Sequence, residues 1–269
     1  MRRSITPLFR ASTLAAMVFM LAGTAHAQFL DEWVNYKWKD VPRTADGKVN
    51  LNAPTPKAAD GKPDLSGFYM PRDFSKLINI AGNRPQDIPL LPAAREVYQQ
   101  RIDTNGKDHP GAYCLPSGIP EKLSVPDGLK VVQTPNVIVF LYESRTIYRQ
   151  VFLDGRKLPK IDTDDFQPSW MGYSVGKWED DTLVVETVGS NGKAWLDMRG
   201  LPGSEALHVT ERYNRPNLGV VNIDVTIDDP KNYSKPWSFK VTWNLRGDAE
   251  LIESICEENS KDAPHMVGK

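Results

Sequence analysis

The run "ALHVTERYN" places three side chains that can transfer protons within six positions. In an extended strand, alternate residues share a face, so Glu211 and Tyr213 lie on the apolar face and His208 on the opposite one. A carboxyl group buried on an apolar face can act as a general acid or base. We therefore expect Glu211 as the acid or base and Tyr213 as a proton donor. His208 is the alternative base, because a one-residue change of strand phase would exchange the two faces.

The run "YESRTIYR" brings arginines close to these candidates. If the chain bends at Glu143, Arg145 and Arg149 share one side of the strand, where a bidentate guanidinium could hold a carboxylate or stabilise a developing oxyanion. Two structural alternatives stay open: one arginine pairs with Glu211 to hold strands in register, or the arginines cover the outside of the sheet. Tyr142, Trp170 and Trp195 are the candidate aromatic contacts for a ligand.

The run "GYSVG" fits the Gly-x-Ser-x-Gly pattern of a serine hydrolase, and Asp197 and His208 follow Ser174 in hydrolase order. That motif needs a strand, a tight turn and then a helix. Here "KWEDDTLVVET" follows, which predicts a polar turn and another strand instead. We therefore expect Ser174 in a hairpin arm, with the glycines allowing close packing against a neighbour such as Trp170 or Trp178.

No metal or cofactor site is expected. The acidic run "WEDDT" is typical of a hairpin turn and lacks the spacing of an EF-hand loop. The histidines outside the leader, His109, His208 and His265, are not spaced as ligands of zinc or iron.

Residues 1–27 have the pattern of a cleaved secretory signal: a basic start, a short apolar run and "AHA" before the expected cleavage after Ala27. We therefore expect a periplasmic or secreted protein without a transmembrane segment. Loss of the three leader arginines changes the formal net charge from -1 to -4, which leaves no basic surface for nucleic acid.

The two cysteines, Cys114 and Cys256, both follow the leader. In an oxidising compartment a disulfide between them is the natural expectation, and free thiols are the alternative.

Residues 28–128 are expected to form an irregular wrap, because twelve of the 21 prolines lie between Pro42 and Pro126. A short helix is predicted near residues 93–102, where "PAAREVYQQRI" starts with proline and ends before Asn-Gly. The runs "ADGKVNLN" and "ADGKPDLS", 14 residues apart, predict a repeated turn.

Residues 129–269 are expected to form an antiparallel, all-β barrel similar to lipocalins or calycins. Short β-type runs follow one another at hairpin spacing, and several alternate between apolar and polar residues. Closing the sheet removes exposed edges. The predicted strands are "KVVQ", "NVIVFLYE", "RTIYRQVFLDG", "WMGYSVGKW", "DTLVVETVG", "ALHVTERYN", "GVVNIDVTID", "WSFKVTWNL" and "AELIESI".

A set of motifs resembles a family of exported bacterial proteins, most of them uncharacterised. The motifs are "DGKPDLSGFY", "CLPSGIP", "VVQTPNVIVFLYE", "GKWEDDTLVVET", "ALHVTERY", "TIDDPKNYSKPW" and "CEEN". The resemblance covers about residues 60–259 and departs from the family pattern at Tyr69, where tryptophan is expected. It implies an exported domain with these two cysteines, and it implies no activity.

These observations predict a barrel that holds a small, largely apolar molecule, aromatic or terpenoid in character, in its lumen. In an enzymatic version, Glu211, Tyr213 and an arginine catalyse a cofactor-free isomerisation, elimination or hydration. The main alternative is a non-catalytic binding or scaffold protein of the cell envelope. A serine esterase acting through Ser174 is the less favoured second alternative.

Overall fold

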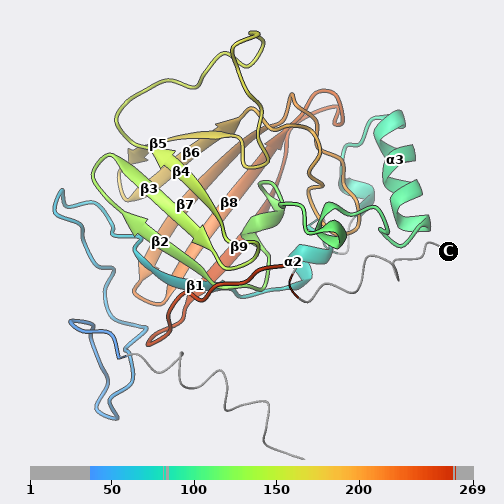
Figure 1. The fold of residues 1–269 in the computed structure, drawn as a ribbon. Coiled ribbons are helices and arrows are strands. Elements are labelled where there is room, and N and C mark those ends of the chain that lie inside the picture. The colour runs from blue at the N-terminus through green and yellow to red at the C-terminus, as the bar shows by residue number, and fades with distance from the viewer. Residues whose placement is uncertain (1–36, 81, 83–84, 257, 259–269) are drawn as a thin grey trace, which may run out of the picture.

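The computed structural model describes residues 37–80, 82, 85–256 and 258, so the expected leader lies outside the described residues. Nine strands form one closed barrel, which confirms the predicted all-β fold (Figure 1). The strands are β1 (Gly67–Pro71), β2 (Leu129–Gln133), β3 (Val137–Tyr142), β4 (Ile147–Phe152), β5 (Tyr173–Glu179), β6 (Thr182–Val188), β7 (His208–Asn217), β8 (Val220–Asp228) and β9 (Trp237–Leu245).

The short strand β1 closes the barrel. Tyr69 pairs with Leu129 of β2 on one side and with Leu245 of β9 on the other. This strand lies within the proline-rich region and was not predicted. The strand expected over "AELIESI" is not formed, because β1 already occupies the edge of β9, and only an isolated bridge joins Ser254 to Ser144.

One pairing in the barrel is parallel. Strands β4 and β5 meet at only two positions, Val151 with Ser174 and Phe152 with Val175, whereas the other neighbouring strands are antiparallel. Residues 153–172 connect β4 to β5 and form the long loop at the top of Figure 1. We expected a wholly antiparallel barrel, and this parallel pairing corrects that expectation. Strands β4 and β5 also have fewer paired residues than any other neighbouring strands of the barrel.

Aromatic side chains fill much of the barrel interior. The rings of Tyr69, Phe140 and Tyr213 each lie 5.6–6.1 Å from the ring of Trp243, measured between centroids. The indole nitrogen of Trp243 donates to the carbonyl of Leu123 at 2.8 Å, so its polar atom is satisfied inside the core. The alternation in β7, β8 and β9 places the apolar residues of these strands inside, as predicted.

The wrap before β1 forms the predicted pair of turns. Equivalent backbone hydrogen bonds recur 14 residues apart: Gly47 donates to Thr44, and Gly61 donates to Ala58. Arg215 fixes the second turn to the barrel by donating to the carbonyl oxygens of Asp64 and Ser66. A buried arginine thus holds an irregular segment that has little secondary structure of its own.

Helical segments lie between β1 and β2 in the chain. Figure 1 shows the longest of them, α3, on the side of the barrel away from the first turns of the wrap. This helix spans the predicted region and begins with proline at its first turn. The helices are α2 (Ser75–Ile78) and α3 (Pro92–Asp103), with 3-10 turns η1 (Pro85–Asp87), η2 (Pro110–Tyr113) and η3 (Glu121–Leu123).

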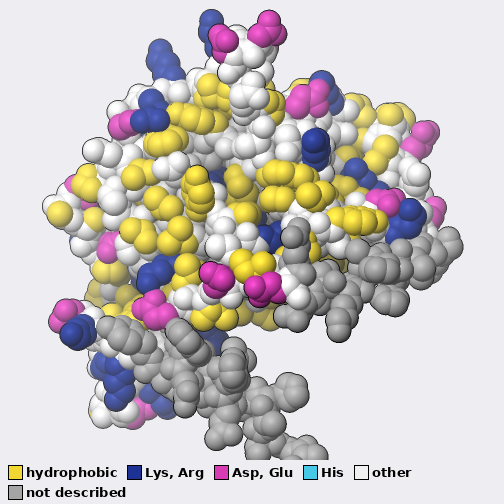
Figure 2. Space-filling view, in the orientation of Figure 1, with side chains coloured by type: hydrophobic (Ala, Val, Ile, Leu, Met, Phe, Trp, Pro, Cys, Tyr) yellow, Lys and Arg dark blue, Asp and Glu magenta, His cyan; other side chains and the backbone are white. Residues whose placement is uncertain are grey.

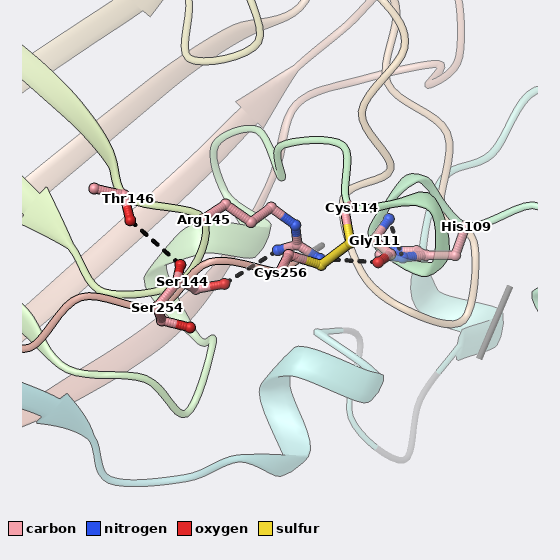
Figure 3. The surroundings of a disulfide bond; sticks show 8 residues. All are labelled: His109, Gly111, Cys114, Ser144, Arg145, Thr146, Ser254 and Cys256. Atoms are coloured by element: carbon pink, nitrogen blue, oxygen red, sulfur yellow. Dashed lines mark hydrogen bonds between the residues drawn. A yellow bond between two sulfur atoms is a disulfide. The ribbon is translucent and has the colours of Figure 1, made fainter. Parts of the chain in front are cut away.

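The predicted disulfide between Cys114 and Cys256 is present. Figure 3 shows it beside the β3–β4 turn, where Arg145 donates to the carbonyl of Gly111 and Thr146 donates to the carbonyl of Ser254. The disulfide and these two hydrogen bonds therefore link three segments that are distant in the sequence: residues 111–114, the β3–β4 turn and residues 254–256. No helix in the described part of the chain is long and apolar enough to cross a membrane.

Candidate ligand-binding site in the barrel wall

A pocket of about 460 Å³ opens between β4 and the segment that leads into β5. Its size lies within the range of small-molecule sites, and apolar or aromatic side chains form most of its wall. Figure 2 shows many hydrophobic side chains on the face of the barrel turned toward the viewer. The pocket is lined by Pro116, Thr146, Ile147, Tyr148, Arg149, Gln150, Phe152, Ser169, Trp170, Met171, Gly172, Tyr173 and Ser174.

The pocket exists because two strands separate. The first four residues of β4, 147–150, pair with β3 but have no paired residue in β5. Ser169 instead forms a bridge with Ser190, beyond the end of β6, which directs the approach to β5 away from β4. This opening was not predicted, because we expected every connection between strands to be a hairpin. The sequence feature that could have indicated it is the long connection between the two strands, residues 153–172, which is too long for a tight hairpin turn.

The base of the pocket is polar. Arg149 and Ser174 line it, although the two residues are only 2% and 1% exposed. The Nε of Arg149 donates to the hydroxyl oxygen of Ser174 at 3.0 Å. The hydroxyls of Ser174 and Thr187 lie 2.9 Å apart and share a hydrogen bond. Ser174 and Arg149 are therefore the buried polar groups that a bound molecule would reach.

An ion pair lies behind this base. Both terminal nitrogens of Arg149 donate to the carboxylate of Glu211, one of them at 3.0 Å. The second nitrogen also donates to the hydroxyl of Thr187 at 2.6 Å, and the hydroxyl of Tyr213 donates to Glu211 at 2.6 Å. Glu211 is fully buried and does not line the pocket. This is the paired, structural arrangement that sequence analysis held open as an alternative.

Electrostatics fix the protonation states of this cluster. Burial alone lowers the pKa of Arg149, but the charge and hydrogen bonds of Glu211 outweigh burial and raise that pKa above its ordinary value. Burial raises the pKa of Tyr142, and both burial and the negative charge of Glu211 raise the pKa of Tyr213. Arg149 is therefore charged and both tyrosines are neutral near pH 7.

The other predicted site residues are dispersed. Tyr142 lies in the barrel interior, and its hydroxyl has no hydrogen-bond partner among the described residues. His208 lies on the outer face, with Nε2 3.5 Å from a carboxylate oxygen of Glu186. The predicted strand phase was therefore right.

Arg145 and Trp195 do not line the pocket. Arg145 has a φ of 62° in the turn between β3 and β4, so it does not share a strand face with Arg149 as expected. Trp195 is buried and contacts the guanidinium of Arg101 and, edge to face, the ring of His109. Of the predicted ligand contacts, the pocket brings together Arg149 and Trp170.

Ser174 is not arranged as a hydrolase nucleophile. It lies in the β5–β6 hairpin, as predicted. Asp197 instead accepts hydrogen bonds from backbone nitrogens of Ile80, Gly200 and Leu201. With His208 on the outer face, the three residues do not meet.

The glycines of "GYSVG" allow close packing, although against different neighbours from those expected. A Cβ on Gly172, which has a φ of +66°, would lie 2.6 Å from the carbonyl oxygen of Val188. A Cβ on Gly176 would lie 2.9 Å from the side chain of Val151. These contacts give both glycines a role in packing that does not require a catalytic serine.

The acidic run "WEDDT" forms the turn between β5 and β6. Asp181 pairs with Lys57 and Glu179 pairs with Arg212, so these carboxylates form salt bridges with basic side chains of the protein. Within the described ranges, no group of three or more metal-ligating side chains is found.

A scan of the chain against protein-family models gives no match, and a search of curated proteins gives no significant match.

Proposed function

We propose that this protein binds a small, largely apolar molecule, aromatic or terpenoid in character, in the pocket between β4 and β5. The observation that carries the proposal is an opening of about 460 Å³ with aromatic walls and two buried polar residues at its base. Such a combination of apolar walls and a few placed polar groups is typical of small-molecule sites.

The aromatic walls are held in place. The rings of Phe152 and Tyr173 lie 5.3 Å apart, and the guanidinium of Arg156 lies 3.8 Å from the centre of the Phe152 ring. Arg156 also donates to the hydroxyl of Tyr173 at 3.0 Å. A wall that is ordered before binding loses little conformational entropy when a ligand packs against it.

The arrangement supports binding rather than acid/base catalysis by Glu211. A catalytic acid or base must come within hydrogen-bond reach of its substrate. Arg149 separates Glu211 from the pocket, and Tyr213 donates to Glu211 rather than to a ligand. We therefore assign Glu211 and Tyr213 to holding Arg149.

Export remains part of the proposal. The disulfide fits an oxidising compartment such as the periplasm or the extracellular space. Mass spectrometry of the protein recovered from its native host tests this: we expect an N-terminus at Gln28 and oxidised cysteines. A retained leader with two free thiols would contradict it.

Binding is tested with a dimethylaminonaphthyl ketone, a neutral fluorescent molecule whose emission shifts to the blue in an apolar site. We expect saturable binding to the wild-type protein. Trp170→Ala should weaken binding by about tenfold or more, since large aromatic contacts dominate such sites.

Phe74→Ala is the matched control, because Phe74 is 49% exposed and does not line the pocket. It should bind the ketone as the wild type does. Absence of binding, or equal binding by Trp170→Ala, would contradict the proposal and favour a scaffold role.

A further inference from the structure

We infer that the pocket selects an uncharged ligand and holds it by a hydrogen-bond-accepting oxygen, such as that of a ketone, aldehyde, ester or ether, placed against Ser174 and Arg149. This inference rests on the proposed function and names the class of ligand. It differs from the carboxylate or enolate that an arginine in such a position first suggests.

The charge of Arg149 is already neutralised. Glu211 takes both terminal nitrogens of the guanidinium, and both residues are almost completely buried. A ligand carboxylate would lose its hydration and meet a cation that already has a carboxylate partner. Burying a charge without a free partner is strongly unfavourable, so an anion is disfavoured.

The hydrogen-bond capacity of the base leaves donors available. Arg149 has five N–H groups, and four of them are used on Ser174, Thr187 and the two carboxylate oxygens of Glu211. The fifth, on Nη1, makes no hydrogen bond in the described part of the structure, although the guanidinium also acts on the buried hydroxyl of Tyr142 and lowers its pKa against the effect of burial.

The Ser174 hydroxyl adds a second donor. It accepts from Arg149, and it shares one hydrogen bond with the Thr187 hydroxyl. When Thr187 donates, both lone pairs of the Ser174 oxygen are occupied and its proton is free to point into the pocket. In that arrangement the side chains at the base offer donors and no free acceptor, so they match an acceptor oxygen of the ligand.

The charged side chain beside the pocket wall is also neutralised by an acidic partner. Arg156, which lies against the wall, is paired with Asp154: its Nε donates to one carboxylate oxygen at 2.8 Å and its Nη2 donates to the other at 2.5 Å. Most of the remaining wall is apolar or aromatic, and Thr146, Gln150 and Ser169 add uncharged polar groups to it. The ligand therefore meets a mostly apolar enclosure without an unpaired charge.

Three matched probes test this selection. They are the dimethylaminonaphthyl ketone, dimethylaminonaphthalene without the ketone group, and dimethylaminonaphthalene with a carboxylate in place of the ketone. We expect the ketone to bind roughly three- to tenfold more tightly than dimethylaminonaphthalene, because one or two hydrogen bonds contribute about this gain in affinity. The carboxylate should bind at least about tenfold more weakly than the ketone.

Two variants identify the groups responsible. Ser174→Ala should remove most of the difference in affinity between the ketone and dimethylaminonaphthalene. Ser238→Ala is its control, because that hydroxyl is exposed on β9 and, among the described residues, its side chain bonds to Thr226 alone. Glu211→Gln leaves Arg149 without its anion, and we expect the preference to move toward the carboxylate by about tenfold or more.

The outcomes separate the two proposals. If no probe binds, the proposed function fails. If the probes bind at the Trp170 site but the wild type prefers the carboxylate, or Ser174→Ala keeps the full advantage of the ketone, the inference fails and the pocket stands. Should Glu211→Gln not fold, the wild-type ranking of the three probes and Ser174→Ala still decide.

Discussion

At the residue scale, the buried pair of Arg149 and Glu211 is the most demanding feature of the protein. Two charges are removed from water, and five hydrogen bonds, with each other and with Ser174, Thr187 and Tyr213, compensate for the lost hydration. The alternation along β7 correctly predicted that the carboxylate of Glu211 points inward. Which arginine would meet it depended on the path of β4, which no local pattern specified.

Removing one partner of this pair should be far worse than removing both. Arg149→Met leaves a buried, unpaired carboxylate, and we expect the free energy of unfolding to fall by about 3–5 kcal/mol. Adding Glu211→Leu to that variant should recover much of the loss. Urea denaturation of the two variants measures this, and a double variant less stable than the single one would contradict it.

Asp197 predicts a pH dependence of stability. Burial raises the pKa of Asp197 to about 6, although three backbone N–H groups bond its carboxylate and act in the opposite direction. Since the folded pKa is above the unfolded value of 3.8, the unfolded state releases its proton first. Asp197 therefore costs stability as the pH rises from about 4 to above 6, by at most about 3 kcal/mol.

The test compares the wild type with Asp197→Asn, which cannot titrate at this position. The difference in unfolding free energy between the two proteins should change between pH 4 and pH 7, with the wild type losing stability relative to the variant. A constant difference over this range would show that Asp197 has no such effect.

At the element scale, the parallel contact of β4 with β5 creates the pocket, and glycine permits it. Replacing Gly172 by alanine would place a Cβ 2.6 Å from the carbonyl oxygen of Val188 at a φ of +66°. Gly155 is a matched control, because its φ is +81° and nothing lies within 4 Å of its Cβ position.

Gly155→Ala should therefore cost about 1–2 kcal/mol, for the left-handed backbone alone. Gly172→Ala should cost a further 1–3 kcal/mol or so, because the clash is with backbone atoms. Thermal denaturation of both variants measures the difference. Equal losses would mean that close packing at Gly172 does not matter.

The disulfide acts on the same part of the molecule. Cys114 is two residues before Pro116, and Thr146 bonds the segment before Cys256; Pro116 and Thr146 both line the pocket. Replacing both cysteines by serine should lower the free energy of unfolding by several kcal/mol, up to about 5 in the chain-entropy model. It should also weaken binding of the ketone several-fold. Unchanged affinity in the folded variant would separate the disulfide from the pocket.

The elements show why prediction from sequence stopped where it did. Strands β7, β8 and β9 alternate regularly, and their inward faces were predicted correctly. Strand β1 was missed because it is five residues long and ends in proline. The pairing of β4 with β5 depends on contacts between segments that are 20 residues apart, and alternation carries no information about which strands are parallel.

At the scale of the whole molecule, the barrel interior is occupied by packed aromatic rings, and the candidate site lies in the wall. A lipocalin-like barrel was expected to hold its ligand in the lumen. Here Trp243, with Tyr69, Phe140 and Tyr213 around it, occupies that space. The closed barrel therefore serves as a rigid frame, and the one parallel seam provides the opening.

NMR spectroscopy of isotopically labelled protein locates the bound ligand. On saturation with the dimethylaminonaphthyl ketone, we predict chemical-shift changes centred on residues 147–152 and 169–174, including the side-chain Nε–H of Arg149. The signals of the Tyr69 and Trp243 rings should change little. Large changes at these rings, with none along β4 and β5, would place the ligand in the lumen and contradict the account.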